Sequence, residues 1–373
     1  MKHGKKFMCL LRETAVALGI ITALYLSFSS MACGTTAEGT KTLDGDFTAP
    51  ELRECSPQSP NELLLRFSKA VTVEDAIVTQ EDTEEAAEAE RKPTEDQSVV
   101  NLALSEPTKT GKQYRVSGTA VDLAGNSLDF SVPFNGYNAG VPGLALSEVR
   151  DGYTSGDKPK SEFIEVYAIT AGNLAGMTLM SAYDGAEKLY VFPDVEVKAG
   201  EYIVVHCRKV GSDAAKAIDE TGTNLHASAS FESTDARDLW MDNPDAESRL
   251  GPSDILLLRD REGGNLLDAL LYADAARMAK NEWQKKAMAD IAKEAFEAGL
   301  WPDGFTPDCA ASSEHMTSTQ TLSRQNIKTI SAQSGVSAAT NGKGAWMVTK
   351  TSSASPGAAN SSEPYVEKTS KRR

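Results

Sequence analysis

The sequence predicts a mainly β protein, with two β-sandwich domains in tandem and an α-helix inserted in the second. Short segments with apolar residues at every second position recur along the chain, separated by turn signals rich in Gly, Pro, Asn and Asp. The clearest pair is 144–150 (LALSEVR) and 162–167 (EFIEVY), in which Ile164 and Val166 share one face and Phe163 the other. The 373-residue length suffices for two domains with ordinary cores.

The first 32 residues have the anatomy of a secretory signal peptide. An apolar run at 15–28 is too short to span a bilayer comfortably, and small or mild residues at 29–32 follow it. The basic residues that precede this run are Lys2, Lys5, Lys6 and Arg12.

Cys33 comes directly after these residues and is followed by Gly34. This order resembles the lipobox of bacterial lipoproteins, with Ser30 where Leu is usual. The resemblance implies cleavage before Cys33 and acylation of its thiol, so that acyl chains in the lipid bilayer anchor the protein at about 0.8 kcal/mol per CH₂. The alternatives are an ordinary signal peptide cut nearby or an uncleaved anchor helix. We therefore expect an exported protein, lipid-anchored to a bacterial membrane, with its folded domains in the periplasm or at the cell surface.

Residues 33–46 are polar and rich in Gly and Thr, as in a flexible spacer. The first sandwich is expected at 47–138, where short strands and turns alternate. Its runs LLLRFSKAV (63–71) and YRVSGTAVDLAGN (114–126) resemble bacterial Ig-like domains of envelope proteins. The acidic, low-complexity middle at 74–98 is expected to form a solvated loop or a short exposed helix.

A Gly-rich linker at 139–143 leads to the second sandwich at 144–360. The order of its strands and motifs resembles the lamin tail domain, an Ig-like β-sandwich. The resemblance implies a sandwich fold and an accessory role, because bacterial members often accompany hydrolases or nucleases. The segments that carry it are Ser147–Val149, Glu162–Tyr167, Leu174–Leu179, Gly200–Val205, Ser253–Asp268, Thr321–Arg324, Trp346 and Ser355–Asn360.

An insertion at about 273–320 interrupts this pattern. Met288, Ile291, Ala292, Ala295 and Phe296 have helical spacing, and Gly299 follows them as a stop signal. We expect this helix to pack against its own sandwich, and a helix that docks another protein is the alternative. The polar end at 361–373 is expected to be a disordered tail.

The formal net charge of −15 disfavours nucleic acid as a partner, because phosphate backbones require a local excess of Lys and Arg. No CxxC, HExxH, GxSxG, P-loop or GxGxxG motif is present, so we predict no cofactor and no metal. Beyond the signal and Cys33, the remaining cysteines are Cys55, Cys207 and Cys309. A bridge between Cys207 and Cys309 and three separate thiols both stay open.

Acidic residues crowd the strand pair at 144–150 and 162–167. Strand alternation favours carboxylates that face solvent or cap loops. The alternative is a cation-dependent hydrolase, or a hydrolase-accessory protein, with an acidic site near Glu148 and Glu165. The acids concerned are Glu148, Asp151, Asp157, Glu162 and Glu165.

We expect no enzyme activity, but binding or scaffolding in the cell envelope through the Ig-like modules. The partner is expected to be an envelope protein or a glycan. Sandwiches present loops to partners, so the loop at 208–250 and the insertion are the expected contact surfaces. Aromatic residues often anchor such contacts, and the candidates are Trp240, Trp283 and Trp301.

Overall fold

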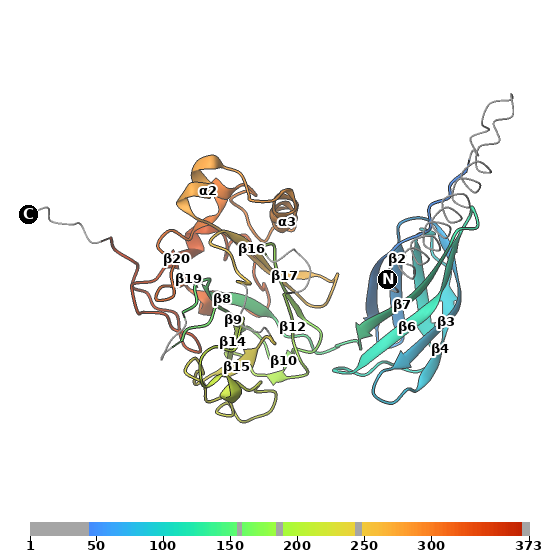
Figure 1. The fold of residues 1–373 in the computed structure, drawn as a ribbon, viewed down its shortest axis with the longest axis horizontal. Helices are drawn as coiled ribbons and strands as arrows, with labels where there is room; N and C mark the ends of the chain where they lie inside the picture. Colours follow the sequence, from blue (N-terminus) through green and yellow to red (C-terminus); the bar gives the residue numbers. More distant parts are fainter. Residues whose placement is uncertain (1–44, 155–158, 184–188, 243–247, 368–373) are drawn as a thin grey trace, which may run out of the picture. The chain divides into compact units, whose positions relative to one another are not determined.

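The computed structural model describes residues 45–154, 159–183, 189–242 and 248–367. Strands dominate and helices are few (Figure 1). The predicted fold class is confirmed: two Ig-like β-sandwiches follow one another, and the second carries inserted helices.

The first sandwich consists of seven antiparallel strands in the order β1-β2-β5-β4-β3-β6-β7. Lettered A to G along the chain, this order is A-B-E-D followed by C-F-G, as in constant-type Ig domains. Because β4 also pairs with β3, one hydrogen-bonded ladder runs through both layers. The strands are β1 Leu52–Ser59, β2 Glu62–Phe67, β3 Val71–Gln80, β4 Ala86–Lys92, β5 Val99–Leu104, β6 Gln113–Asp122 and β7 Ser127–Asn135.

The side chains that face inward from both layers meet in one core. Leu63 and Leu65 of β2 and Val116 of β6 are fully buried there. Phe67 and Phe130 meet edge to face, with ring centroids 5.8 Å apart. The alternating pattern that predicted these strands therefore places one face of each strand in the core.

The expectation of a loop or short exposed helix at 74–98 is wrong. This acidic segment contains most of β3 and all of β4. Most side chains of β4 are exposed, so its composition resembles a solvated loop. Backbone hydrogen bonds to β3 and β5 hold it as a strand, and side-chain polarity does not reveal such bonds.

The second sandwich packs a six-stranded sheet, β15-β14-β9-β8-β19-β20, against a five-stranded sheet, β12-β11-β16-β17-β18. A short pair, β10-β13, completes it. The strands are β8 Leu144–Arg150, β9 Phe163–Ala168, β10 Gly172–Asn173, β11 Thr178–Ser181, β12 Tyr190–Val191, β13 Glu196–Val197, β14 Tyr202–His206, β15 Arg237–Trp240, β16 Asp254–Arg259, β17 Leu266–Ala273, β18 Ala311–Ser312, β19 Leu322–Arg324 and β20 Trp346–Val348.

The predicted pair β8 and β9 is confirmed as antiparallel, with a bulge at Ser147. Ile164 and Val166 face the core between the two sheets, as expected. Phe163 and Glu165, on the other face of β9, are also fully buried. Contacts from Glu232 and Gly357 to β8 and β9 show that later loops cover this outer face of the sheet.

The insertion carries two helices, α2 Ala275–Lys280, which follows β17 in the chain, and α3 Lys286–Glu297, which packs near β16 and β17 (Figure 1). Met288, Ala292 and Ala295 are buried against the sandwich, so the predicted amphipathic helix packs on its own domain. Gly299 ends α3 with φ +73°, and the Leu300 amide donates to the Ala295 carbonyl, as in a Schellman motif. The short 3₁₀ turns are η1 Ala214–Lys216, η2 Pro307–Cys309, η3 Ile327–Thr329 and η4 Lys343–Ala345.

Cys207 is buried and Cys309 is half-buried, and the structure shows no disulfide between these two residues. Within the described part of the chain, no helix has the length and apolar character needed to cross a membrane.

Candidate functional site

The acids of the β8–β9 pair meet on the outer face of the six-stranded sheet. Glu148 and Glu165 are register partners on β8 and β9, and both side chains are completely buried. The expectation that these carboxylates face solvent is therefore wrong. The other expected role, hydrogen bonding to a loop, agrees with their contacts to Ser355 and Gly357.

Glu148 accepts hydrogen bonds from two segments far away in the sequence. The hydroxyl groups of Thr321 and Ser323, at β19, both donate to its Oε1 atom. The Ser355 amide lies 3.1 Å from Oε1, and the Ser355 hydroxyl lies 3.2 Å from Oε2. Burial raises the pKa of Glu148, although all of these donors favour the charged form.

Glu165 has fewer partners than Glu148. Its Oε2 atom accepts a hydrogen bond of 2.6 Å from the Gly357 amide, whereas Oε1 is buried without a hydrogen bond. Burial first, and the charge of Glu148 second, hold the pKa of Glu165 well above its usual value. Glu165 therefore keeps its proton over a wider pH range than an exposed glutamate.

We predict that Glu165→Gln changes the pH dependence of stability. Between the ordinary pKa of 4.5 and the raised value, the folded state binds more protons than the unfolded state. The free energy of unfolding of the native protein should therefore fall by up to about 1.4 kcal/mol per pH unit as the pH rises through this window. The variant lacks this titration. Urea unfolding from pH 4 to 8 measures the effect, and parallel pH profiles for the two proteins would refute it.

The closing loop, residues 355–360, is fixed by these acids and by Asn360. The Asn360 amide donates to the carbonyls of Ser147 at 3.0 Å and Arg324 at 2.8 Å. Gly357 has φ +79°, and a Cβ atom there would lie 2.7 Å from the Thr234 hydroxyl, so no other residue fits without strain. The loop is thereby held against the strand pair β8–β9.

A buried ion pair connects the two sheets behind this cluster. Arg324 of β19 donates to both carboxylate oxygens of Asp268 of β17, at 2.8 and 2.9 Å. The Leu146 amide of β8 donates to the same carboxylate at 2.7 Å. The Arg324 guanidinium also lies over the Trp346 ring, 4.8 Å from its centroid. Both partners of the pair are fully buried.

The remaining acids of the predicted cluster do not join Glu148 and Glu165. Glu162 pairs with Arg208, whose Nε lies 2.9 Å from Oε2. Burial raises the pKa of Asp151 to about 7. Asp157 lies outside the described residues. Among the residues that the structure describes, no group of three or more His, Cys, Asp or Glu side chains has the arrangement of a metal site. The carboxylates of Glu148 and Glu165 thus serve the closing loop.

His206 and Cys207 point to opposite faces of the sheet, as strand alternation predicts. Cys207 lies in the sandwich core. The His206 ring stacks on Trp240 with centroids 3.9 Å apart, and its Nε2 lies 2.9 Å from Asp238. Asp238 also accepts a bond of 2.7 Å from the Thr234 amide, so this pair holds the preceding loop on the sheet.

The structure removes two tryptophans from the expected contact surface. Trp240 is buried in its stack with His206. Trp301 is fully buried, and its indole N–H donates to the Cys309 carbonyl at 3.0 Å. Both residues follow polar segments in the sequence, but their rings are enclosed by the sandwich and the insertion. They are therefore core residues.

Trp283 belongs to an exposed aromatic patch on the insertion, formed by Trp283, Phe296 and Phe305. Phe296 and Phe305 are 40% and 37% exposed, and their ring centroids lie 5.7 Å apart. The half-buried Trp283 donates from its indole N–H to the Phe305 carbonyl at 2.9 Å. The helical spacing included Phe296 in the buried stripe, and the structure places it at the solvent edge. Phe305 gave no signal in the sequence.

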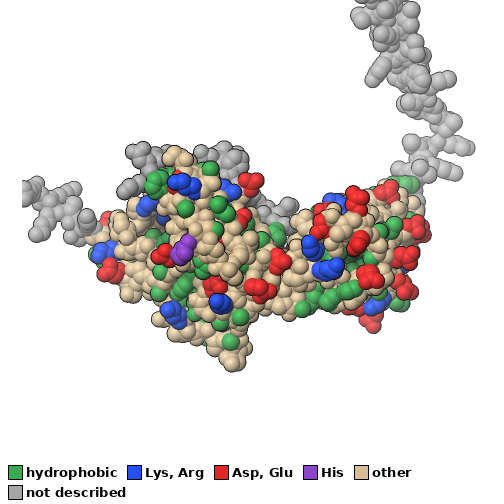
Figure 2. All heavy atoms as spheres, turned by 90° about the horizontal axis from the view of Figure 1, so that it is seen from below, with side chains coloured by type: hydrophobic (Ala, Val, Ile, Leu, Met, Phe, Trp, Pro, Cys, Tyr) green, Lys and Arg blue, Asp and Glu red, His purple; other side chains and the backbone are tan. Residues whose placement is uncertain are grey.

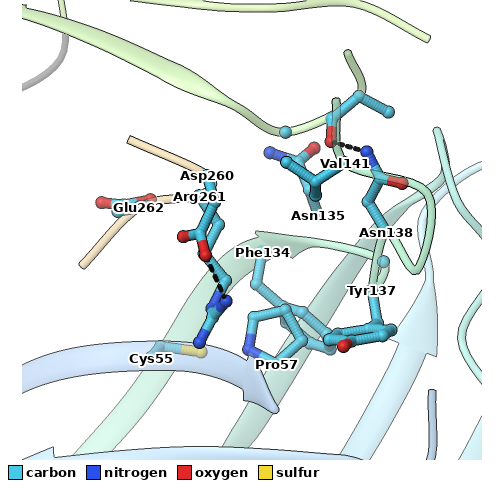
Figure 3. A pocket seen from close by; sticks show the side chains of 13 residues that line it. Cys55, Pro57, Phe134, Asn135, Tyr137, Asn138, Val141, Asp260, Arg261 and Glu262 are labelled. Carbon is cyan, nitrogen blue, oxygen red and sulfur yellow. Dashed lines mark hydrogen bonds and ion pairs between the residues drawn. The ribbon is translucent and has the colours of Figure 1, made fainter. Parts of the chain in front are cut away.

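A small pocket is lined by Pro57, Phe134, Tyr137 and Arg261, among others (Figure 3). Its volume of about 30 Å³ has room for roughly one water molecule. The Asn138 amide beside it donates to the Asn173 and Ala175 carbonyls. This pocket is too small for an organic ligand.

A family model matches most of the second sandwich. A family model described as "TP_1001_2nd: protein second domain" matches residues 142–348. A Treponema pallidum (strain Nichols) protein named "Uncharacterized protein" is 31% identical over 196 residues. The match covers 51% of this chain and 48% of that protein, so the chain spans about half the length of this relative.

Solved structures give distant likenesses. The N-terminal part of the bacterial S-layer protein SbsC is 18% identical with a TM-score of 0.25, over 42% of this chain and 40% of that chain. A DUF4876 family protein from Bacteroides thetaiotaomicron VPI-5482 is 13% identical with a TM-score of 0.26, over 69% and 84%. At these TM-scores the likenesses support no inference about function.

Proposed function

Because the chain belongs to the TP_1001_2nd family through residues 142–348, we propose that its function resides in the second sandwich. The proposed role is non-catalytic binding or scaffolding in a bacterial cell envelope, for an envelope protein or a glycan. The first sandwich would act as a spacer between the membrane and this domain. We also propose that the second sandwich is a lamin-tail-like domain.

The contacts made by the buried acidic residues support a non-catalytic role. The acids that suggested a cation-dependent hydrolase, Glu148 and Glu165, are buried and bonded to the closing loop. The motif residues Glu148, Asp268, Arg324 and Asn360 contact one another or shared neighbours, as expected of residues that define a fold. Phe296 and Phe305 of the aromatic patch, in contrast, are exposed.

The aromatic patch is the observation that carries the binding proposal. Exposed aromatic rings that contact each other offer a large apolar area that requires little additional ordering on binding. Charged residues of the same helix lie next to Phe296: Lys293 Nζ lies 3.4 Å from the Glu297 carboxylate. An apolar centre with a charged rim is the usual composition of a protein interface, and aromatic rings also stack on sugars.

Charge supports a partner other than nucleic acid. On the face drawn in Figure 2, Asp and Glu side chains gather over the first sandwich, with Lys and Arg interspersed. This agrees with the formal net charge of −15. A polyanion would be repelled by such a surface.

Membrane anchoring is proposed through Cys33, which lies outside the described residues. We expect cells fed radioactive palmitate to label the native chain and leave Cys33→Ala unlabelled, because the acyl chains require this thiol. Cys55→Ala serves as the matched control and should label normally. Equal label in native protein and Cys33→Ala would contradict the anchor.

The binding role is tested by crosslinking in intact cells and identification of the captured molecules. We expect Phe296→Ser and Phe305→Ser, combined, to reduce recovery of a specific partner at least tenfold. Ile77→Ser, which alters an exposed apolar residue of the first sandwich, should leave recovery unchanged.

A second variant separates the two expected contact surfaces. Phe231 is 54% exposed in the loop that precedes β15. If Phe231→Ser abolishes recovery and the patch variant does not, the contact surface lies on that loop. If the pure protein shows hydrolase activity and captures no partner, the binding proposal fails.

A further inference from the structure

The last described residues form an antiparallel bridge with the edge of the six-stranded sheet, next to β20. The Lys350 amide donates to the Glu363 carbonyl at 2.9 Å, and the Tyr365 amide donates to the Val348 carbonyl at 2.8 Å. Thr349 and Pro364 form the bridge between these bonds. The expectation of disorder is therefore wrong for 363–365, whereas 368–373 lie outside the described residues.

Two side-chain contacts define the position of this segment on the edge. Lys350 Nζ lies 3.1 Å from the Glu363 carboxylate. The Tyr365 ring lies against the His315 ring, with centroids 4.5 Å apart and planes tilted by 31°. Glu363 and Tyr365 are two positions apart in an extended segment. The Glu363 carboxylate thus pairs with Lys350, and the Tyr365 ring packs on His315.

The segment is attached lightly. Ser362, Glu363, Pro364 and Val366 are all exposed, and an ion pair in solvent contributes little to stability. The preceding loop is held independently, because Asn360 bonds to Ser147 and Arg324. Residues 362–367 can therefore leave the edge while the closing loop stays in place.

Departure of the segment would expose the backbone groups of 348–350. Free sheet edges bind extended strands through main-chain hydrogen bonds, and side-chain contacts then select the strand. Pro364 has no N–H group, so the segment itself offers a poor edge for further pairing. The segment both occupies the edge and blocks growth of the sheet beyond it.

We propose that the edge 348–351 is a docking site for an extended strand of a partner protein with a carboxylate two positions before an aromatic residue. The chain's own segment 362–367 occupies this site until such a strand competes for it. The positive charge of Lys350, in a chain of formal charge −15, favours the carboxylate. The His315 ring provides the surface for the aromatic side chain. This site is separate from the aromatic patch on the insertion and does not depend on it.

The test measures binding of a fluorescein-labelled peptide with the sequence of residues 361–367 (SSEPYVE) by fluorescence anisotropy. The two proteins are the full chain and a variant without residues 362–373. A tethered competitor acts at an effective concentration in the millimolar range, so the deletion should tighten peptide binding at least tenfold. Equal unfolding midpoints, followed by tryptophan fluorescence, check that the variant is folded.

Two controls test the recognition chemistry. A peptide with Tyr365→Ala should bind the truncated chain at least fivefold more weakly. Lys350→Glu in the truncated chain should weaken binding of the native peptide and strengthen binding of a peptide with Glu363→Lys. Binding that is no tighter after truncation, or equal binding of the alanine peptide, would overturn the proposal. Dimerisation of the truncated chain without peptide binding, seen by light scattering, would assign the edge to a second copy and would also overturn it.

Discussion

Arg324→Met is expected to lower the free energy of unfolding of the second sandwich by about 3–5 kcal/mol, because it leaves the Asp268 carboxylate buried without its counter-ion. The pair joins β17 of one sheet to β19 of the other, and both side chains are fully buried. The charged form of Asp268 would keep only neutral donors, such as the Leu146 amide. Loss of the contact between the guanidinium and Trp346 adds to the effect.

The measurement is urea unfolding followed by tryptophan fluorescence. All four tryptophans lie between residues 240 and 346, so the signal reports on the second sandwich. The double variant Arg324→Met, Asp268→Asn should be more stable than Arg324→Met alone, because it removes the uncompensated charge. Lys293→Met, which breaks the exposed pair with Glu297, is the control and should change little. A loss no larger than that of the control would show that the buried pair does not hold the sheets together.

Glu148→Met is expected to destabilise the same domain by about 3 kcal/mol, since it removes the acceptor for the Ser355 amide and for three hydroxyl groups. Methionine has a similar length but no acceptor of comparable strength. The closing loop should loosen, and amide hydrogen exchange at residues 355–360 should rise. The same unfolding experiment measures the stability change.

Glu165→Met is the matched control for Glu148→Met. Glu165 is the register partner of Glu148 and equally buried, but it has fewer donors, namely the Gly357 amide and the Ser147 hydroxyl. Glu165→Met should lower the free energy of unfolding by about 1 kcal/mol or less. The loss of these hydrogen bonds is offset because a buried carboxyl group that is hard to ionise is removed. If both variants lose the same free energy of unfolding, the two glutamates stabilise the domain by packing and not by hydrogen bonding.

Both predictions concern residues that the sequence already brought forward as motifs. Glu148, Asp268, Arg324 and the run from Ser355 to Asn360 all lay in the pattern that resembles lamin tail domains. Their spacing did not reveal which residue bonds to which, because the partners are separated by up to about two hundred positions. The sequence therefore favoured carboxylates that face solvent or cap loops, and it left a cation site near Glu148 as the alternative.

Periodicity served well where one side of an element faces the core. Alternation predicted β8 and β9, and helical spacing predicted α3, because in each case apolar residues recur on the buried side. Sequence pattern was misleading for β4, because backbone hydrogen bonds hold this strand and its side chains are mostly exposed. It was also misleading for Trp240 and Trp301, whose rings are buried although polar residues surround them in the sequence. It was also silent on Phe305, which becomes part of a patch through contact with Phe296.

The sequence by itself determined the mainly β class and the place of the inserted helix, since these depend on local periodicity and turn chemistry. It also carries the signal-peptide pattern ending at Cys33 that motivates the proposed anchor. Only the tertiary structure decided that Glu148 and Glu165 hold the closing loop and that Arg324 joins the two sheets. It also placed residues 363–365 on the edge beside β20. The physical reason is that these arrangements depend on hydrogen bonds and burial between distant segments, and a linear pattern of residue types does not encode which segments meet.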